Sequence, residues 1–133
     1  MIVVDTNVLA YLLIEGVHTE AARAVLAKDA EWIAPPLWRS EFRNLLMLYL
    51  RRGAFSLADT LNLMAGAERR LEGGEISVDS SLVLSLALAS GCTAYDSEFV
   101  ALAQSVGVPL VTADRKVIAA FPTTAVSLEN FVA

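Results

Sequence analysis

The chain of 133 residues has one cysteine, Cys92, and one histidine, His18. A single cysteine cannot form an internal disulfide, so we expect Cys92 to be a small buried residue in a reducing compartment, the cytoplasm. His18 has no second histidine at a metal-ligand spacing and no serine or cysteine nucleophile paired with it. The sequence therefore supports neither a zinc site nor histidine-based catalysis.

Charged residues are also scarce, at 19%, whereas hydrophobic residues make up 56%. The longest apolar stretches, such as Leu82–Ala89, are interrupted by serine and are too short to span a bilayer. Met1 leads directly into an apolar run without a basic segment, so we expect no secretory signal and no membrane association. The apolar excess over an ordinary soluble domain predicts surface left for partners, and we expect oligomerisation.

The net charge of −5 argues against a nucleic-acid-binding protein, because phosphate affinity normally comes from a basic surface. The average hides a local pattern, however. Eight of the ten basic residues form four close pairs: Arg39/Arg43, Arg51/Arg52, Arg69/Arg70 and Arg115/Lys116. An acidic chain can therefore still present basic edges.

Strand and helix patterns alternate along the whole chain, which has the length of one domain, and we predict a single domain over residues 1–133. Short apolar runs predict strands at Ile2–Val4, Glu31–Ala34, Thr93–Tyr95 and Pro109–Thr112. Helices are expected from Asp5 to about Glu15, and at 18–29, Leu37–Arg52, 56–71, Ser80–Ser90, Ser97–Val106 and Arg115–Ala120. This order predicts an α/β fold with a parallel sheet covered on both faces.

Three aspartates follow predicted strands: Asp5, Asp96 and Asp114. Ligands of open parallel sheets bind beyond the carboxyl ends of the strands, where these side chains would gather. Each aspartate could instead cap the helix that follows it. Capping alone does not explain three acids at one edge, because serine or threonine would cap without mutual repulsion.

Glu41 is a fourth acid, on the helix predicted at Leu37–Arg52. It falls on that helix's apolar face, together with Leu37, Trp38, Phe42, Leu45, Leu48 and Tyr49. A buried carboxylate must be neutralised, paired or bound to a metal. A salt bridge to an arginine is the alternative, but no basic residue shares this face before Arg52.

Four converging carboxylates would repel one another unless a cation lay among them. Ligand sets made only of oxygen suit Mg²⁺, or Mn²⁺, rather than zinc. Such a metal can activate water and stabilise charge on a phosphoryl oxygen. The chemistry that these groups suit best is phosphodiester hydrolysis.

The same residues resemble a known family. The segments that carry the resemblance are Val3–Leu9, Ser40-Glu41, Tyr95–Ala103 and Leu110–Asp114, which occur in the right order and spacing. Together they resemble a PIN-domain protein, and more narrowly a toxin ribonuclease of the VapC type. The resemblance implies a three-layer α/β/α sandwich with a short central parallel sheet and Mg²⁺-dependent endoribonuclease activity. It also implies homodimerisation and inhibition by a cognate antitoxin.

The resemblance assigns roles to individual residues. Asp5 and Asp96 match the usual metal ligands, and Glu41 and Asp114 match the motifs that complete the cluster. Two further positions match supporting residues: Thr112, a hydroxyl near the site, and Asn7, which braces the loop that carries the first aspartate.

Four other polar residues need separate interpretations. Arg115 and Lys116 directly follow Asp114 and are our candidates for binding substrate phosphate. Glu98 is expected in the first turn of its helix, where a negative charge favours the helix dipole. Asp79 is expected to cap the helix Ser80–Ser90.

Two other functions remain open. A phosphotransferase of the haloacid-dehalogenase kind also begins with a strand and an aspartate, but it needs a second aspartate where Asn7 stands, and Lys116 is its only plausible lysine. Alternatively, the chain could be a catalytically silent interaction module whose acids cap helices.

Overall fold

The computed structural model describes residues 1–133, which form four strands and eight helices. The strands are β1 (Ile2–Val4), β2 (Trp32–Ile33), β3 (Leu110–Val111) and β4 (Ala125–Val126). The helices are α1 (Thr6–Leu13), α2 (Thr19–Lys28), α3 (Trp38–Arg51), α4 (Leu57–Arg70), α5 (Ser80–Ser90), α6 (Ala94–Val106), α7 (Arg115–Ala120) and α8 (Leu128–Val132).

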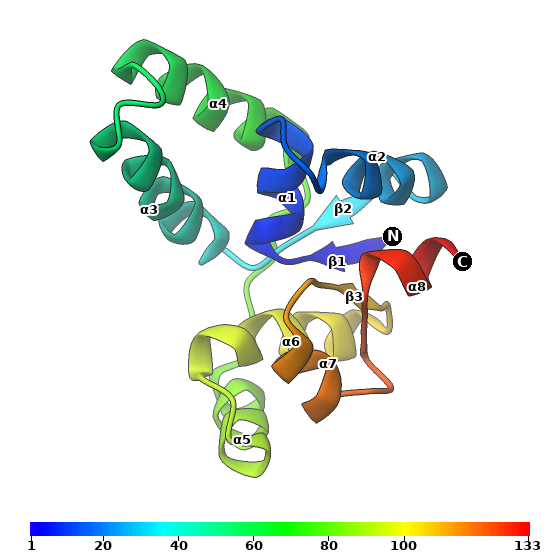
Figure 1. Cartoon of the computed structure of the whole chain (residues 1–133). Helices are drawn as coiled ribbons and strands as arrows, with labels where there is room; N and C mark the ends of the chain where they lie inside the picture. Colours follow the sequence, from blue (N-terminus) through cyan, green and yellow to red (C-terminus); the bar gives the residue numbers. More distant parts are fainter.

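The four strands form one parallel sheet in the order β2-β1-β3-β4. Val3 lies opposite Ile33 on one side and Leu110 on the other, so β1 is central. Helices α1 to α4 lie on one side of the sheet, and α5 to α7 lie on the other (Figure 1). The predicted three-layer α/β/α fold with a short parallel sheet is confirmed.

The strands are short but completely apolar, and β1 is buried along its whole length. A hydrophobic core of 25 buried residues includes side chains from all four strands and reaches from Ile2 to Leu128. One continuous core thus joins the sheet to the helices that cover it. The longest helices, α3 and α4, have 14 residues, and no helix is long and apolar enough to cross a membrane.

One predicted strand is wrong. Thr93–Tyr95 begins helix α6: the Thr93 side chain caps the helix and accepts a hydrogen bond from the backbone N–H of Asp96 at 3.0 Å. A threonine three residues before an acid favours a helix start, and this local cap outweighs the strand propensity of Thr and Tyr. The fourth strand is instead β4, in a segment where the sequence predicts no strand.

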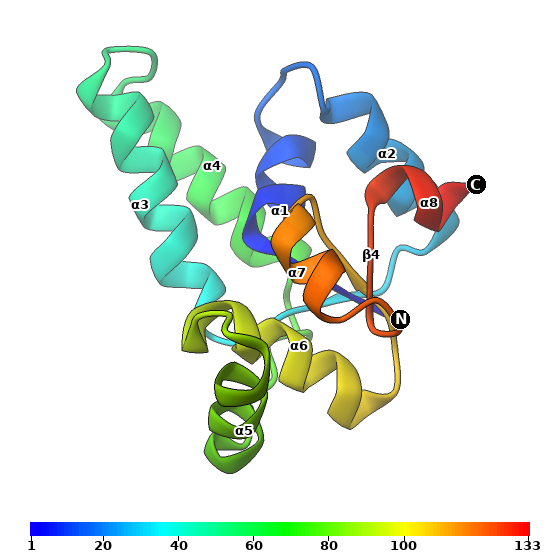
Figure 2. The same ribbon diagram turned by 60° about the horizontal axis from the view of Figure 1, so that its bottom comes forward.

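Other predicted boundaries agree within a few residues. Ser56 forms a capping box with Asp59 at the start of α4, and Asp79 caps α5 as expected. Helix α5 ends at Gly91, whose φ of +74° is a left-handed conformation that glycine adopts without strain. The turn at Gly91 folds α6 back along α5, which projects from the body of the molecule (Figure 2).

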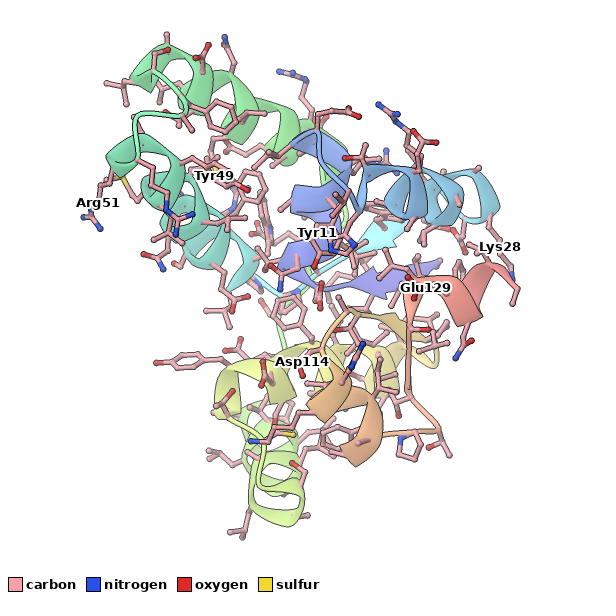
Figure 3. All side chains as sticks on the ribbon, in the orientation of Figure 1. Tyr11, Lys28, Tyr49, Arg51, Asp114 and Glu129 are labelled. Atoms are coloured by element: carbon pink, nitrogen blue, oxygen red, sulfur yellow. The ribbon has the colours of Figure 1, made fainter.

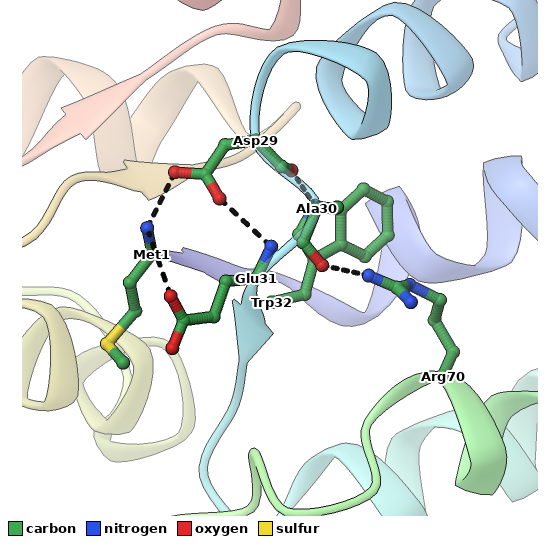
Figure 4. Close-up of polar contacts among 6 residues, drawn as sticks. All are labelled: Met1, Asp29, Ala30, Glu31, Trp32 and Arg70. Carbon is green, nitrogen blue, oxygen red and sulfur yellow. Dashed lines mark hydrogen bonds and ion pairs between the residues drawn. The ribbon is translucent and has the colours of Figure 1, made fainter.

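The start of the chain is held at the edge of the sheet opposite the acids. The Met1 ammonium group lies 2.6 Å from the Asp29 carboxylate, and Trp32 Nε1 donates to the Asp29 carbonyl at 2.8 Å (Figure 4). These contacts fix the first residues of β1 beside β2. The other end of β1 therefore delivers Asp5 to a defined position.

Candidate active site

Asp5 lies where the chain leaves β1 and enters α1. Its Oδ1 accepts a hydrogen bond from the Val8 N–H at 2.9 Å and so caps α1. Its Oδ2 accepts a hydrogen bond from the hydroxyl of Thr112, the residue after β3. Capping uses only one carboxylate oxygen, so the capping role and a place in an acidic site are compatible.

Asp114 caps α7 in the same manner, since its Oδ1 accepts from the backbone N–H groups of Lys116 and Val117 at 2.9 and 3.2 Å. Its own N–H donates to Thr112 Oγ1 at 3.0 Å. The buried Thr112 hydroxyl thus links Asp5 to Asp114 through two hydrogen bonds. Thr112, which was predicted to support the site, therefore contacts both of these acids.

Glu41 lies in the first turn of α3, at the edge of its buried face. The Thr6 hydroxyl donates to Glu41 Oε1 at 2.7 Å, and no cation forms an ion pair with this carboxylate. The salt bridge that the sequence left open is therefore absent. Leu48, predicted on the same apolar face, is 44% exposed, because this side of α3 faces a cleft rather than the core.

Asp96 lies near the other three acids, but the element that carries it is not the one predicted. It does not follow a strand; it is the third residue of α6, and Thr93 caps that helix. The Asp96 side chain accepts no hydrogen bond within the protein, so both of its oxygens remain available. The capping explanation therefore does not account for Asp96.

All four acids line one open cleft of about 270 Å³ between the two helical layers. Thr112 and Asn7 also line it, together with Thr6, Asn44, Leu45, Leu48, Phe99, Leu110 and Val117. Figure 3 shows the Asp114 side chain in this space, whereas Arg51 lies at the outer end of α3. Acids from four separate elements thus converge, as the sequence predicts.

Burial and neighbouring charges raise the pKa values of two of the acids, Asp5 and Glu41. Burial raises the pKa of Asp5 despite the hydrogen bond from Thr112, and the charge of Asp114 raises it further. Burial likewise raises the pKa of Glu41, and the charges of Asp5, Asp96 and Glu98 act in the same direction. The cleft is therefore a place where negative charge is costly and a cation would be favourable.

The carboxylate oxygens of the cleft are the type of donor that hard divalent cations bind. No group of three or more acidic, histidine or cysteine side chains stands at metal-binding distances. Hydrogen bonds within the protein occupy four carboxylate oxygens: both oxygens of Asp5, Oε1 of Glu41 and Oδ1 of Asp114. Asp96, Glu41 and Asp114 line the same cleft and each keeps a carboxylate oxygen without a hydrogen bond, and oxygen donors of this kind fit Mg²⁺ or Mn²⁺.

The remaining predicted residues lie at the margin of the cleft. Arg115 and Lys116 are exposed at the start of α7, form no ion pair, and do not line the cleft themselves. Asn7 lines the cleft, but its side chain makes no hydrogen bond that would brace the Asp5 loop. By contrast, Arg39 is held by Glu68 and Glu75, each at 2.7 Å.

Two polar residues of the cleft were missed. Thr6 follows Asp5 directly and holds Glu41, and a hydroxyl beside the first acid was the available signal. Asn44 lies three residues after Glu41, a spacing that places both on one side of α3. Helical periodicity therefore makes Asn44 predictable once Glu41 has been chosen, whereas the contact of Thr6 with Glu41 depends on how α1 packs against α3.

Comparisons with known proteins agree with this architecture. The PIN domain family matches residues 2–122. Ribonuclease VapC3 of Pyrobaculum aerophilum is 27% identical over 124 residues, covering 91% of this chain and 95% of the relative.

Two crystal structures share the fold. PAE2754 from Pyrobaculum aerophilum has a TM-score of 0.77 at 22% identity, covering 98% of this chain and 92% of that one. FitAcB from Neisseria gonorrhoeae has a TM-score of 0.71 at 16% identity, covering 97% and 99%. The chain thus belongs to the PIN domain family.

Proposed function

We propose that the chain is a Mg²⁺-dependent endoribonuclease, the toxin of a toxin–antitoxin pair, acting in the cytoplasm. The observation that carries this proposal is the convergence of four acids from four elements on one cleft. The similarity to a relative named a ribonuclease supports RNA as the substrate. The reaction would be hydrolysis of an RNA phosphodiester bond.

Asp5, Glu41, Asp96 and Asp114 would hold the metal, with Mn²⁺ as a possible substitute. A divalent cation bound there would activate a water molecule and stabilise negative charge on the phosphoryl oxygen. The raised pKa values of Asp5 and Glu41 support this assignment, because a bound cation would offset both the burial of these carboxylates and the nearby negative charge.

Other residues of the chain would position these groups. Thr112 and Thr6 restrict the orientation of Asp5 and Glu41 through hydrogen bonds, as supporting residues around metal sites do. Arg115 and Lys116 carry charges that no carboxylate neutralises, and they would bind the substrate backbone beside Asp114. Asn7 would contact the substrate from the wall of the cleft.

The simplest test incubates the chain with RNA and Mg²⁺, with and without EDTA. The proposal predicts internal cleavage that EDTA abolishes and Mn²⁺ restores. A silent interaction module would cleave nothing under any of these conditions. A phosphotransferase or phosphatase would instead release phosphate from p-nitrophenyl phosphate while leaving RNA intact.

We further propose that an amphipathic antitoxin helix binds the apolar surface of α3 and α4. Four large apolar side chains are exposed there: Met47, Leu48, Leu57 and Leu61. A helix laid against this surface could bury them and extend a basic side chain into the acidic cleft. Replacing Leu57 and Leu61 with Asp should weaken inhibition by the antitoxin without reducing cleavage, and unchanged inhibition would contradict this docking site.

The chain is also proposed to form a homodimer. Large apolar side chains remain exposed on α5 as well, where Leu84 and Leu88 are 63% and 88% exposed. Apolar surface on this scale is typical of lasting interfaces. Light scattering at high micromolar concentration tests the dimer, and a monomer would contradict it.

A further inference from the structure

Glu98 is a half-buried carboxylate that neither the fold nor the proposed metal site explains. Because α6 begins at Ala94 rather than Ser97, Glu98 is the fifth residue of the helix and lies beyond its first turn. The expected stabilisation by the helix dipole is therefore lost. Glu98 forms no ion pair, accepts no hydrogen bond, and repels the charge of Glu41.

The Glu98 side chain lines a shallow pocket beside the acidic cleft. The pocket has a volume of about 400 Å³ and lies between α6 and the start of α5. Ser77 and Ser80 supply hydroxyl groups, and Val83 and Leu84 supply an apolar wall. The lining therefore combines hydrogen-bonding groups with an apolar wall.

An exposed aromatic ring lies on the same helix as Glu98. Tyr95 is the only exposed one of the chain's ten aromatic residues, with 63% of its surface accessible. It lies three residues before Glu98, so the two side chains share one side of α6. Asp96, between them in sequence, lines the acidic cleft.

We propose that Tyr95, Glu98 and this pocket form a recognition subsite for an unpaired RNA base next to the scissile phosphate. The proposal rests on the proposed ribonuclease function. Tyr95 would stack on the base, an interaction that every base can make. The Glu98 carboxylate, which is only an acceptor, would accept a hydrogen bond from an exocyclic amino group.

This chemistry defines the preferred substrate. Cytosine presents an amino group where uracil presents a carbonyl oxygen, which a carboxylate repels. Bases within a duplex are stacked and have this edge paired, so the subsite requires a single strand or a loop. The subsite thus selects single-stranded RNA and discriminates against uridine at one position.

A cation of a protein partner is the competing occupant, because a lysine or arginine could also pair with Glu98. Two observations favour the base. The charge of Glu98 acts on Glu41 in the cleft, so the pocket lies close enough for neighbouring nucleotides of one strand to reach both. The exposed ring of Tyr95 offers a stacking surface, which a buried ion pair does not require.

The test compares oligoribonucleotides that differ only in having cytidine or uridine at each position flanking the cleavage site. At one position the wild-type kcat/KM should favour cytidine about tenfold. Glu98→Gln should abolish this preference, since an amide can donate to the uracil oxygen, whereas Glu72→Gln, at an exposed acid without an ion pair, should leave it unchanged. This ratio is independent of the fraction of active, metal-loaded enzyme.

Tyr95 has a different expected signature. Tyr95→Ser should raise KM about tenfold for both substrates and keep their ratio, whereas Tyr95→Phe, which retains the ring, should behave like the wild type. Equilibrium binding of oligocytidylate and oligouridylate in EDTA provides a readout that needs no cleavage. There, too, the wild type should prefer oligocytidylate and Glu98→Gln should not.

An equal rate for both bases at every position, or a preference that survives Glu98→Gln, would overturn the subsite. So would variants that bind and cleave RNA normally but escape antitoxin inhibition, because the pocket would then hold a protein cation. A wild type that cleaves no RNA would contradict the proposed function instead. In that case the binding preference decides the subsite alone.

Discussion

Replacing Thr112 with valine removes the hydroxyl that joins Asp5 to Asp114 and changes little else. Thr112 is 1% exposed, and valine has nearly the same shape and suits the end of a strand. The substitution leaves Asp5 Oδ2 without its donor and the Asp114 N–H without its acceptor. The cost therefore comes from hydrogen bonding and not from a cavity.

The magnitude follows from these two losses. A hydrogen bond to a charged group contributes about 1.5–3 kcal/mol, and an unsatisfied N–H costs about 1–3 kcal/mol where water cannot reach it. The cleft is open, so water recovers part of this energy, and we expect a loss of about 3 kcal/mol. Domains are stable by roughly 5–15 kcal/mol, so the variant should remain folded.

Urea unfolding in EDTA measures this loss, with Thr112→Ser as the matched control that keeps the hydroxyl. Because the Thr112 hydroxyl stabilises the ionised carboxylate, its removal raises the pKa of Asp5 further. The difference between Thr112→Val and the wild type should therefore shrink as the pH falls and Asp5 becomes protonated. RNA cleavage should fall about 10- to 100-fold in the valine variant, as for other residues that orient metal ligands, but not in the serine variant.

Two results would refute this reasoning. A loss below about 0.5 kcal/mol would mean that the hydroxyl bridge does not hold the acids together. Full activity in the valine variant together with a loss in the serine variant would mean that the methyl group, and not the hydroxyl, matters at this position.

Three further predictions concern the acids. Asp96→Asn should abolish cleavage while the protein stays folded. The control Asp79→Asn, which keeps a cap on α5 outside the cleft, should retain activity. An active Asp96→Asn variant would show that Asp96 is not a catalytic residue. Folding raises the pKa values of Asp5 and Glu41, so the folded state binds their protons more tightly than the unfolded state does. Without metal, these two groups therefore stabilise the fold most below their ordinary pKa values, and this stabilisation is lost as the pH rises through the raised pKa values. Thermal unfolding in EDTA between about pH 4.5 and 8 measures this slope, which saturating Mg²⁺ should reverse. Finally, Mn²⁺ should replace Mg²⁺ in cleavage assays, whereas Ca²⁺ should bind but support little activity; full activity with Ca²⁺ would argue against a strict octahedral site.

The layered fold was predictable because the signals that define it are local. Each apolar run that ends in Asp5 or precedes Asp114 is bounded by residues that cap helices, and Gly91 and Gly107 end helices as expected. Strand periodicity was less informative. Strands of two or three residues are defined by their hydrogen bonds to neighbours, which the sequence does not show.

The Thr93–Tyr95 error illustrates this limit. Thr and Tyr favour strands, but the hydrogen bond from the Asp96 N–H to Thr93 starts a helix there. Asp96 nevertheless faces the cleft, because the first turn of α6 and the end of β1 lie at the same edge of the sheet. The position of this acid was predictable, although the element that carries it was not.

The partners of the acids were harder to predict than the acids themselves. The hydrogen bond from Thr6 to Glu41 spans 35 residues, and that from Thr112 to Asp5 spans 107. Contacts over such separations depend on how the layers pack. The same is true of Glu98, whose pocket forms only when α5 folds against α6.

The central claim is that the four acids form one divalent-cation site. Calorimetric titration of Mn²⁺ into the wild type and into Asp5→Asn, Glu41→Gln, Asp96→Asn and Asp114→Asn tests it most directly, with Asp79→Asn as the control. We expect every one of the four substitutions to weaken binding at least tenfold and the control to bind as the wild type does. Binding that is unchanged by the loss of any one of these acids would contradict its place in the site, and unchanged binding in all four variants would contradict the claim.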